Sequence, residues 1–192
     1  MSRGPERGTG HADAQELAAR WAIGGAVVWS VALLSGPALR PDLDPWTTHP
    51  ETYAIGAWGA LMRLGYAGVG VAGWAAAFLA RRYRVASALL AVFATCALAI
   101  GLLPPSGRGD FADQVFPYLQ VAPLAFLPAV ASISLRIRRR VLVALAAAAW
   151  LLFAPLVLGQ PALGGIINRA ADLAIGIWIG VFAWTARDGL PA

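Results

Sequence analysis

Residues 85–103 read VASALLAVFATCALAIGLL, a stretch without a single charged side chain. Arg81-Arg82-Tyr83-Arg84 precedes it, and Pro104-Pro105 follows it. A helix of about 20 apolar residues crosses the hydrocarbon core of a bilayer, where every backbone polar group must be paired within the protein. The stretch therefore predicts a membrane-spanning α-helix.

Similar apolar stretches recur along the chain and predict an all-α fold, a polytopic six-helix transmembrane bundle. Pro123 and Pro128 are expected to kink the fourth span. The predicted domain organisation is a disordered cytoplasmic tail and helix lead-in at 1–18, with the helix starting near Asp13, then a transmembrane domain at 19–187 and a C-terminal tail at 188–192. The other five predicted spans are 21–39, 53–80, 115–135, 141–158 and 166–186.

The overall composition argues against an ordinary soluble protein. Hydrophobic residues make up 59% of the chain and charged residues 13%, with a mean hydropathy of +0.65. Soluble domains carry about 25% charged residues. The single cysteine, Cys96, cannot form an internal disulfide and is expected to act as a small apolar residue.

The basic residues follow a topological pattern. All fifteen are Arg; eleven fall at the end of the bundle that holds both termini, and four fall at the other end. With the acidic residues included, the two ends carry net charges of +7 and −2. The positive-inside rule then predicts cytoplasmic N and C termini in a multi-pass protein of a bacterial cytoplasmic membrane. Because no basic helix with interleaved aromatics is present, no nucleic-acid partner is expected.

Ionisable residues inside a span are costly and indicate function. Asn168, Asp172, Gly176 and Gly180 lie four apart and share one face of the last predicted helix. Gly176 and Gly180 permit close helix packing, so Asp172 is expected to face the bundle. Asp172 is either a buried proton-transfer group or the partner of Arg169 in an ion pair that fixes the helix end.

Arg63 lies inside the second predicted span, on the same helical face as Tyr66. Its guanidinium can clamp a carboxylate or phosphate group of a ligand. The alternatives are that Arg63 extends to the membrane interface or pairs with Asp172 or Glu51.

The outer connections carry acidic residues and one histidine, His49. Their spacing matches no zinc motif, so no metal site is expected, and the simplest interpretation is a solvated loop with Trp46 at the interface. No phosphate-binding loop, dinucleotide fingerprint or histidine pair for haem is present, and no cofactor is expected. The acidic residues are Asp42, Asp44, Glu51, Asp110 and Asp113.

Three motifs carry a resemblance to a known family. They are YAIGAWGALMRLGY at 53–66, GLLPPSG at 101–107 and GGIINR at 164–169. With these motifs, residues 20–187 resemble the bacterial domain-of-unknown-function family 998. The resemblance implies a six-span membrane protein with polar motifs toward one face and no established reaction. Members often carry an acid after the third-span Pro and a His downstream, where this chain has Ser106 and Asp113-Gln114.

Three functional hypotheses follow. The first is an outward-facing intramembrane pocket for a lipid-like or isoprenoid molecule. The second is a membrane-embedded acid–base enzyme on an isoprenoid substrate, similar to terpene cyclases, and the third is a small permease or partner subunit. Expected partners are membrane lipids, a lipid-like small molecule, and a second copy or another membrane protein packed on the glycine stripes. The candidate catalytic residues are Asp172, Glu51 and Asp113, and the candidate ligand-binding residues are Arg63, Tyr66, Asn168, Arg169, Asp110 and Trp58.

Overall fold

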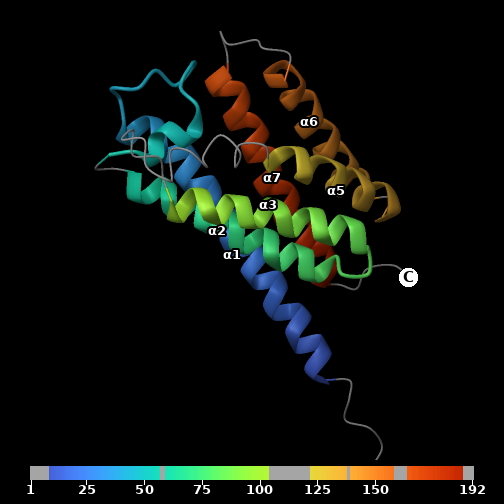
Figure 1. Cartoon of the computed structure of the whole chain (residues 1–192). Coiled ribbons are helices and arrows are strands. Elements are labelled where there is room, and N and C mark those ends of the chain that lie inside the picture. Colours follow the sequence, from blue (N-terminus) through green and yellow to red (C-terminus); the bar gives the residue numbers. More distant parts are fainter. Residues whose placement is uncertain (1–8, 57–58, 104–121, 138, 158–163, 188–192) are drawn as a thin grey trace, which may run out of the picture.

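A computed structural model describes residues 9–56, 59–103, 122–137, 139–157 and 164–187. Within these ranges the chain forms helices and no strand, which confirms the all-α prediction (Figure 1). The elements are α1 (Thr9–Leu39), the 3-10 helix η1 (Pro50–Ala54), α2 (Gly59–Leu79), α3 (Arg84–Leu102), α5 (Ala122–Ile137), α6 (Arg140–Val157) and α7 (Gly164–Arg187).

Two helix starts differ from the prediction. The first helix begins at Thr9, ahead of the expected start near Asp13. The second predicted span began at Tyr53, but Tyr53 belongs to η1 and α2 starts at Gly59. Gly56 separates the two elements: its φ of 86° is a left-handed conformation that glycine adopts without strain. The apolar composition of 53–58 therefore hid a turn.

Within the described residues, three helices contain segments that are long and apolar enough to cross a membrane: Ala12–Leu39, Arg84–Leu102 and Gly164–Arg187. The prediction had six such helices. In α2, Arg63 and five glycines lower the mean hydropathy although the helix has 21 residues. Described parts of α5 and α6 hold the shorter apolar segments Pro123–Ile137 and Arg140–Leu152. Pro128 lies inside α5, as expected, whereas Pro123 lies in its first turn.

Helices α1 and α2 cross with their backbones in direct contact at Gly25 and Gly68. A Cβ added at Gly25 would lie 2.2 Å from the Gly68 carbonyl oxygen and 3.0 Å from the Ala72 methyl. Ala72 and Ala76 are fully buried. The small-residue stripe of α2 thus packs within the chain. In α7, Gly176 faces the ring of Trp29, whereas a Cβ at Gly180 would meet nothing within 4 Å, so only half of the expected glycine contact forms.

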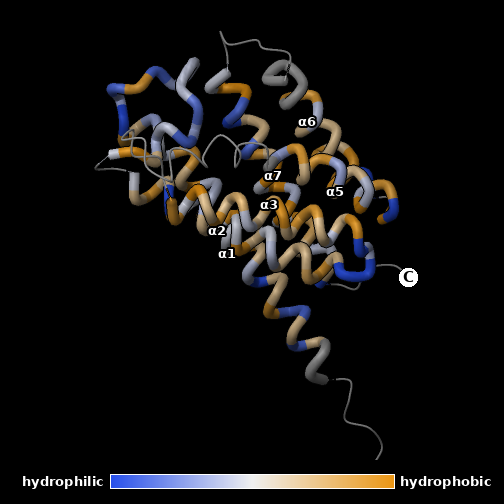
Figure 2. The backbone as a smooth tube through the Cα atoms, viewed as in Figure 1, coloured by the Kyte–Doolittle hydropathy of each residue, from blue (hydrophilic) through white to orange (hydrophobic). Residues whose placement is uncertain are grey.

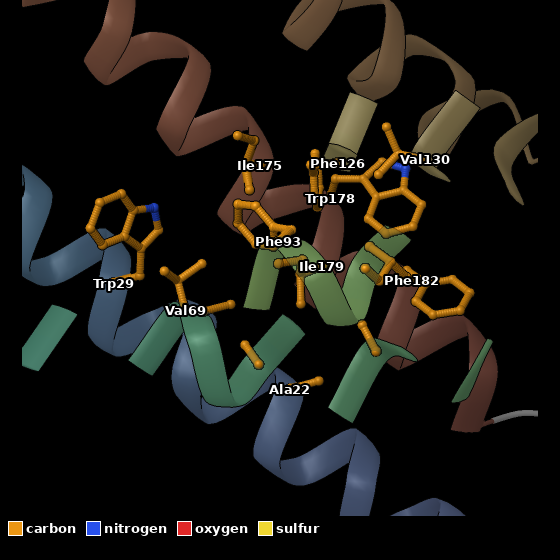
Figure 3. Packing of buried hydrophobic residues seen from close by; sticks show 14 of the residues in the cluster. Ala22, Trp29, Val69, Phe93, Phe126, Val130, Ile175, Trp178, Ile179 and Phe182 are labelled. Atoms are coloured by element: carbon orange, nitrogen blue, oxygen red, sulfur yellow. The ribbon is translucent and has the colours of Figure 1, made fainter. Parts of the chain in front are cut away.

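The centre of the bundle is aromatic (Figure 3). Phe126 of α5 lies between Phe93 of α3 and Trp178 of α7, with ring centroids 4.7 and 5.7 Å away. Trp178 also donates its indole N–H to the Ser134 hydroxyl at 3.0 Å, and Ser134 donates to the Leu142 carbonyl at 3.2 Å. The buried Ser134 hydroxyl is therefore satisfied both as acceptor and as donor, as burial requires.

The connection between α2 and α3, at one end of the bundle, is strongly hydrophilic (Figure 2). There the guanidinium groups of Arg82 and Arg136 both lie over the Tyr83 ring, which brings the α2–α3 and α5–α6 connections together. At the same end, Glu16 of α1 pairs with Arg187 of α7 at 3.0 Å. The loop at 40–56 lies at the opposite end, beside the first turn of α7 (Figure 1).

Replacing Gly25 with Ala tests the α1–α2 contact. The added methyl group cannot fit against backbone, so we expect a loss of about 1–3 kcal/mol in the free energy of unfolding. The control is Gly24→Ala, where nothing lies within 4 Å and the better helix propensity of Ala should stabilise the protein. Thermal unfolding in detergent measures both variants. Equal midpoints for the two would contradict the described crossing.

Candidate functional site

The loop between α1 and α2 folds over the first turn of α7. The Trp46 carbonyl oxygen accepts hydrogen bonds from the backbone N–H groups of Gly165 at 2.9 Å and Ile166 at 3.3 Å. The first N–H groups of a helix have no partner within the helix, so this carbonyl satisfies two of them. Gly165 has no room for a side chain, since an added Cβ would lie 2.7 Å from the Thr48 carbonyl oxygen.

Inside the loop, Arg40 holds the chain in place. Its guanidinium donates to both carboxylate oxygens of Asp42 and to the Ile55 carbonyl, the latter at 2.7 Å. The hydrogen bond from Arg40 holds the pKa of Asp42 below its usual value. Asp44 accepts from the Trp46 N–H at 3.0 Å and from the Thr47 hydroxyl at 2.9 Å. These two acids therefore shape the loop, while Asp42, Asp44 and Trp46 stay exposed, in line with the expected solvated segment.

The polar side chains of α7 reach this loop. The Asn168 amide lies 2.9 Å from His49 Nδ1, and the same ring nitrogen lies 3.9 Å from the Glu51 carboxylate. Glu51 is mostly buried, with 15% of its side chain exposed, although η1 lies at the surface end of the bundle. Two predicted site residues, Asn168 and Glu51, are thus brought together through a histidine.

Arg169 binds the loop rather than Asp172. It donates to the Pro45 carbonyl oxygen, and its guanidinium carbon lies 4.6 Å from the centre of the Tyr53 ring. No ion pair joins Arg169 to Asp172 among the described residues. The structure therefore does not contain the Arg169–Asp172 ion pair that was one of the two expectations. The Arg169 side chain points toward the loop, where a carbonyl oxygen and an aromatic face both stabilise the cation.

Asp172 and Tyr66 lie deeper on the same side. The backbone carbonyl of Asp172 accepts from the Trp29 indole at 3.0 Å, and the Trp29 ring lies 4.8 Å from that of Tyr66. The Asp172 side chain is partly buried. The negative charge of Glu51 acts on both Asp172 and Tyr66, and the positive charge of Arg169 acts on Asp172. The arrangement brings two acids and a phenol within electrostatic range of one another.

The remaining predicted site residues fall elsewhere. Arg63 is partly buried on α2, its Nε atom has no partner among the described residues, and its backbone carbonyl packs against Gly101 of α3. No hydrogen bond or ion pair connects it to Asp172 or Glu51 in the described part of the chain. Trp58, Asp110 and Asp113 lie outside the described residues.

Sequence reasoning missed Tyr53 and underrated His49. The sequence predicts Tyr53 at the start of a span, but it lies under Arg169 and is 2% exposed. In the sequence, Pro50 and Gly56 are the residues that indicate a separate short element, η1. Within the described ranges no group of three or more metal-ligating side chains occurs. The side chains of this site can form hydrogen bonds through Arg, Tyr and His, and its carboxyl groups can transfer protons.

A methyl group at Gly165 should detach the loop from α7. In Gly165→Ala the Cβ would press on the carbonyl oxygens of Pro45 and Thr48, so we expect faster amide hydrogen exchange across 44–48. Gly164→Ala is the matched control, because its Cβ would make an ordinary 3.6 Å contact with His49. Unchanged exchange in the Gly165 variant would argue against the docked loop.

Comparisons with known proteins find no relative of this chain. No protein-family model matches the chain, and comparisons with curated proteins and with solved structures give no match either. A proposed function therefore rests on the geometry of the loop and the α7 N-terminus.

Proposed function

We propose that this protein is a multi-pass protein of the bacterial cytoplasmic membrane. All six α-helices would lie in the bilayer with both termini in the cytoplasm, and the outer end would hold a lipid-like or isoprenoid molecule. The observation that carries the proposal is the cluster at the α7 N-terminus. There the Arg169 guanidinium lies over the Tyr53 ring, and Asp172 and Tyr66 lie deeper, within electrostatic range of Glu51.

The outer surface of the helices supports a membrane setting. Large apolar side chains are exposed on several helices: Trp21 is 60% exposed, Leu34 66%, Val85 76% and Leu151 74%. Soluble monomers rarely expose contiguous apolar surface on this scale. A lipid-like ligand can therefore reach the cluster laterally, with its chain along the helices and its polar end at Arg169. Membership of the bacterial domain-of-unknown-function family 998, which the chain resembles in three motifs, is part of this proposal.

A second candidate function is acid–base catalysis on an isoprenoid substrate. It is favoured by the mutual electrostatic influence of Glu51, Asp172 and Tyr66, because acids placed together near an apolar site can deliver and recover a proton. In this version Asp172 is the acid and Glu51 or Asp113 its partner. The third hypothesis, a small permease or partner subunit, has no specific contact in its favour.

Reporter fusions test the topology. Fusions at the N-terminus, at the C-terminus and after Arg82 should show cytoplasmic signals, and a fusion in the loop at residue 47 should show an external one. This outcome follows from the net charges of +7 and −2 at the two ends. An N-terminus and a C-terminus on opposite sides would contradict an even number of spans.

Asp172→Asn separates the two candidate functions. We expect the fold to persist, since Trp29 bonds the backbone carbonyl at this position, which the substitution keeps. If the protein only binds, native mass spectrometry should show weaker retention of a co-purified lipid. If it catalyses, binding should persist while turnover falls by about 10²–10⁴-fold.

The matched control is Asp13→Asn, an exposed acid at the far end of α1. If Asp172→Asn unfolds more easily but retains the lipid as well as the original protein does before it unfolds, Asp172 has only a structural role.

A further inference from the structure

Two hydrogen-bond donors at the α7 N-terminus are buried without a partner. They are the hydroxyl of Tyr53 and the Nη2 group of Arg169, and neither is satisfied by any residue that the structure describes. The guanidinium lies over the ring that carries the hydroxyl. Burying a polar group without a hydrogen bond destabilises the fold, so two such donors on neighbouring side chains indicate a missing acceptor.

Arg169 is fixed in place for such a role. Its Nη1 group donates to the Pro45 carbonyl oxygen and its flat face rests on Tyr53, so Nη2 is the nitrogen left over. The loop that supplies Pro45 is itself held to α7 by the Trp46 carbonyl. A donor held by two neighbours loses little conformational entropy when a ligand binds, which favours affinity.

The surrounding charges limit what the acceptor can be. Glu51 and Asp172 lie within electrostatic range of each other, and Arg169 supplies the only opposing charge that acts on Asp172 among the described groups. The backbone N–H groups of Gly165 and Ile166, which could otherwise hold an anion, already bond Trp46. Arg40 also acts on Tyr53, but its guanidinium is already paired with Asp42 at 2.7 Å. A phosphate bound here would therefore face Glu51 and Asp172, whereas an uncharged oxygen would avoid this repulsion and still accept from the two donors.

We propose that the Tyr53 hydroxyl and Arg169 Nη2 together bind the uncharged oxygen of an isoprenoid alcohol. This inference rests on the proposed function, since it names the polar end of the lipid-like molecule. On the α1 side of Tyr53, a hollow of about 10 Å³ between Gly36, Leu61 and Met62 holds at most one water. Arg169 does not line this hollow, so in this proposal the shared oxygen lies on the face of Tyr53 that Arg169 covers.

Three probes test the head-group assignment in the full-length protein in nanodiscs. They are geranylgeraniol, geranylgeranyl monophosphate and the hydrocarbon squalene, compared by native mass spectrometry. We expect geranylgeraniol to bind most tightly. In Tyr53→Phe its affinity should fall by about three- to tenfold, the effect of one lost hydrogen bond.

The same variant should unfold at an unchanged or higher temperature, because it removes a buried unpaired hydroxyl. Tyr83→Phe is the control, since Tyr83 carries the same hydroxyl at the arginine-rich end. Its affinity for geranylgeraniol should match that of the original protein.

The outcomes separate this inference from the proposed function. If none of the three probes binds, the proposed isoprenoid site itself is wrong. If geranylgeraniol binds but Tyr53→Phe leaves its affinity unchanged, or if the monophosphate binds more tightly, the site stands and the assignment of Tyr53 and Arg169 to an uncharged oxygen is overturned.

Discussion

The site depends on one carbonyl oxygen. By accepting from two N–H groups at the start of α7, Trp46 fastens a loop of the α1–α2 connection onto a helix that lies more than a hundred residues later. The contacts between the loop and α7 form beside this attachment: His49 meets Asn168, and Arg169 meets Pro45 and Tyr53. Because Gly165 leaves no space for a methyl group, the attachment is steric as well as electrostatic.

The helical framework follows from patterns of apolar and basic residues. Stretches such as 85–103, with arginines before and prolines after, predict α3 closely, and the arginine-rich end appears where the charge pattern places it. The second span was misplaced because 53–58 is as apolar as a helix. Gly56, with its positive φ, lies between η1 and α2, and composition does not show a dihedral angle.

The candidate site was predicted in part. The periodicity of α7 brought Asn168, Arg169 and Asp172 to one region, and the acidic loop pointed to Glu51. Helical spacing also suggested that Arg169 would pair with Asp172, yet the guanidinium turns to Pro45 and Tyr53. That choice depends on a contact across more than a hundred residues of sequence, and a pattern within one helix carries no information about it.

Trp29 gives the site an additional property. Its indole N–H bonds the Asp172 carbonyl, and its ring packs on Tyr66 and beside Gly176. The ring is 2% exposed, so it samples the interior of the bundle and not bulk solvent. A change in the hydrogen bonding or polarity around Asp172 therefore alters the surroundings of a single indole. The chain contains its own spectroscopic reporter for events at the α7 N-terminus.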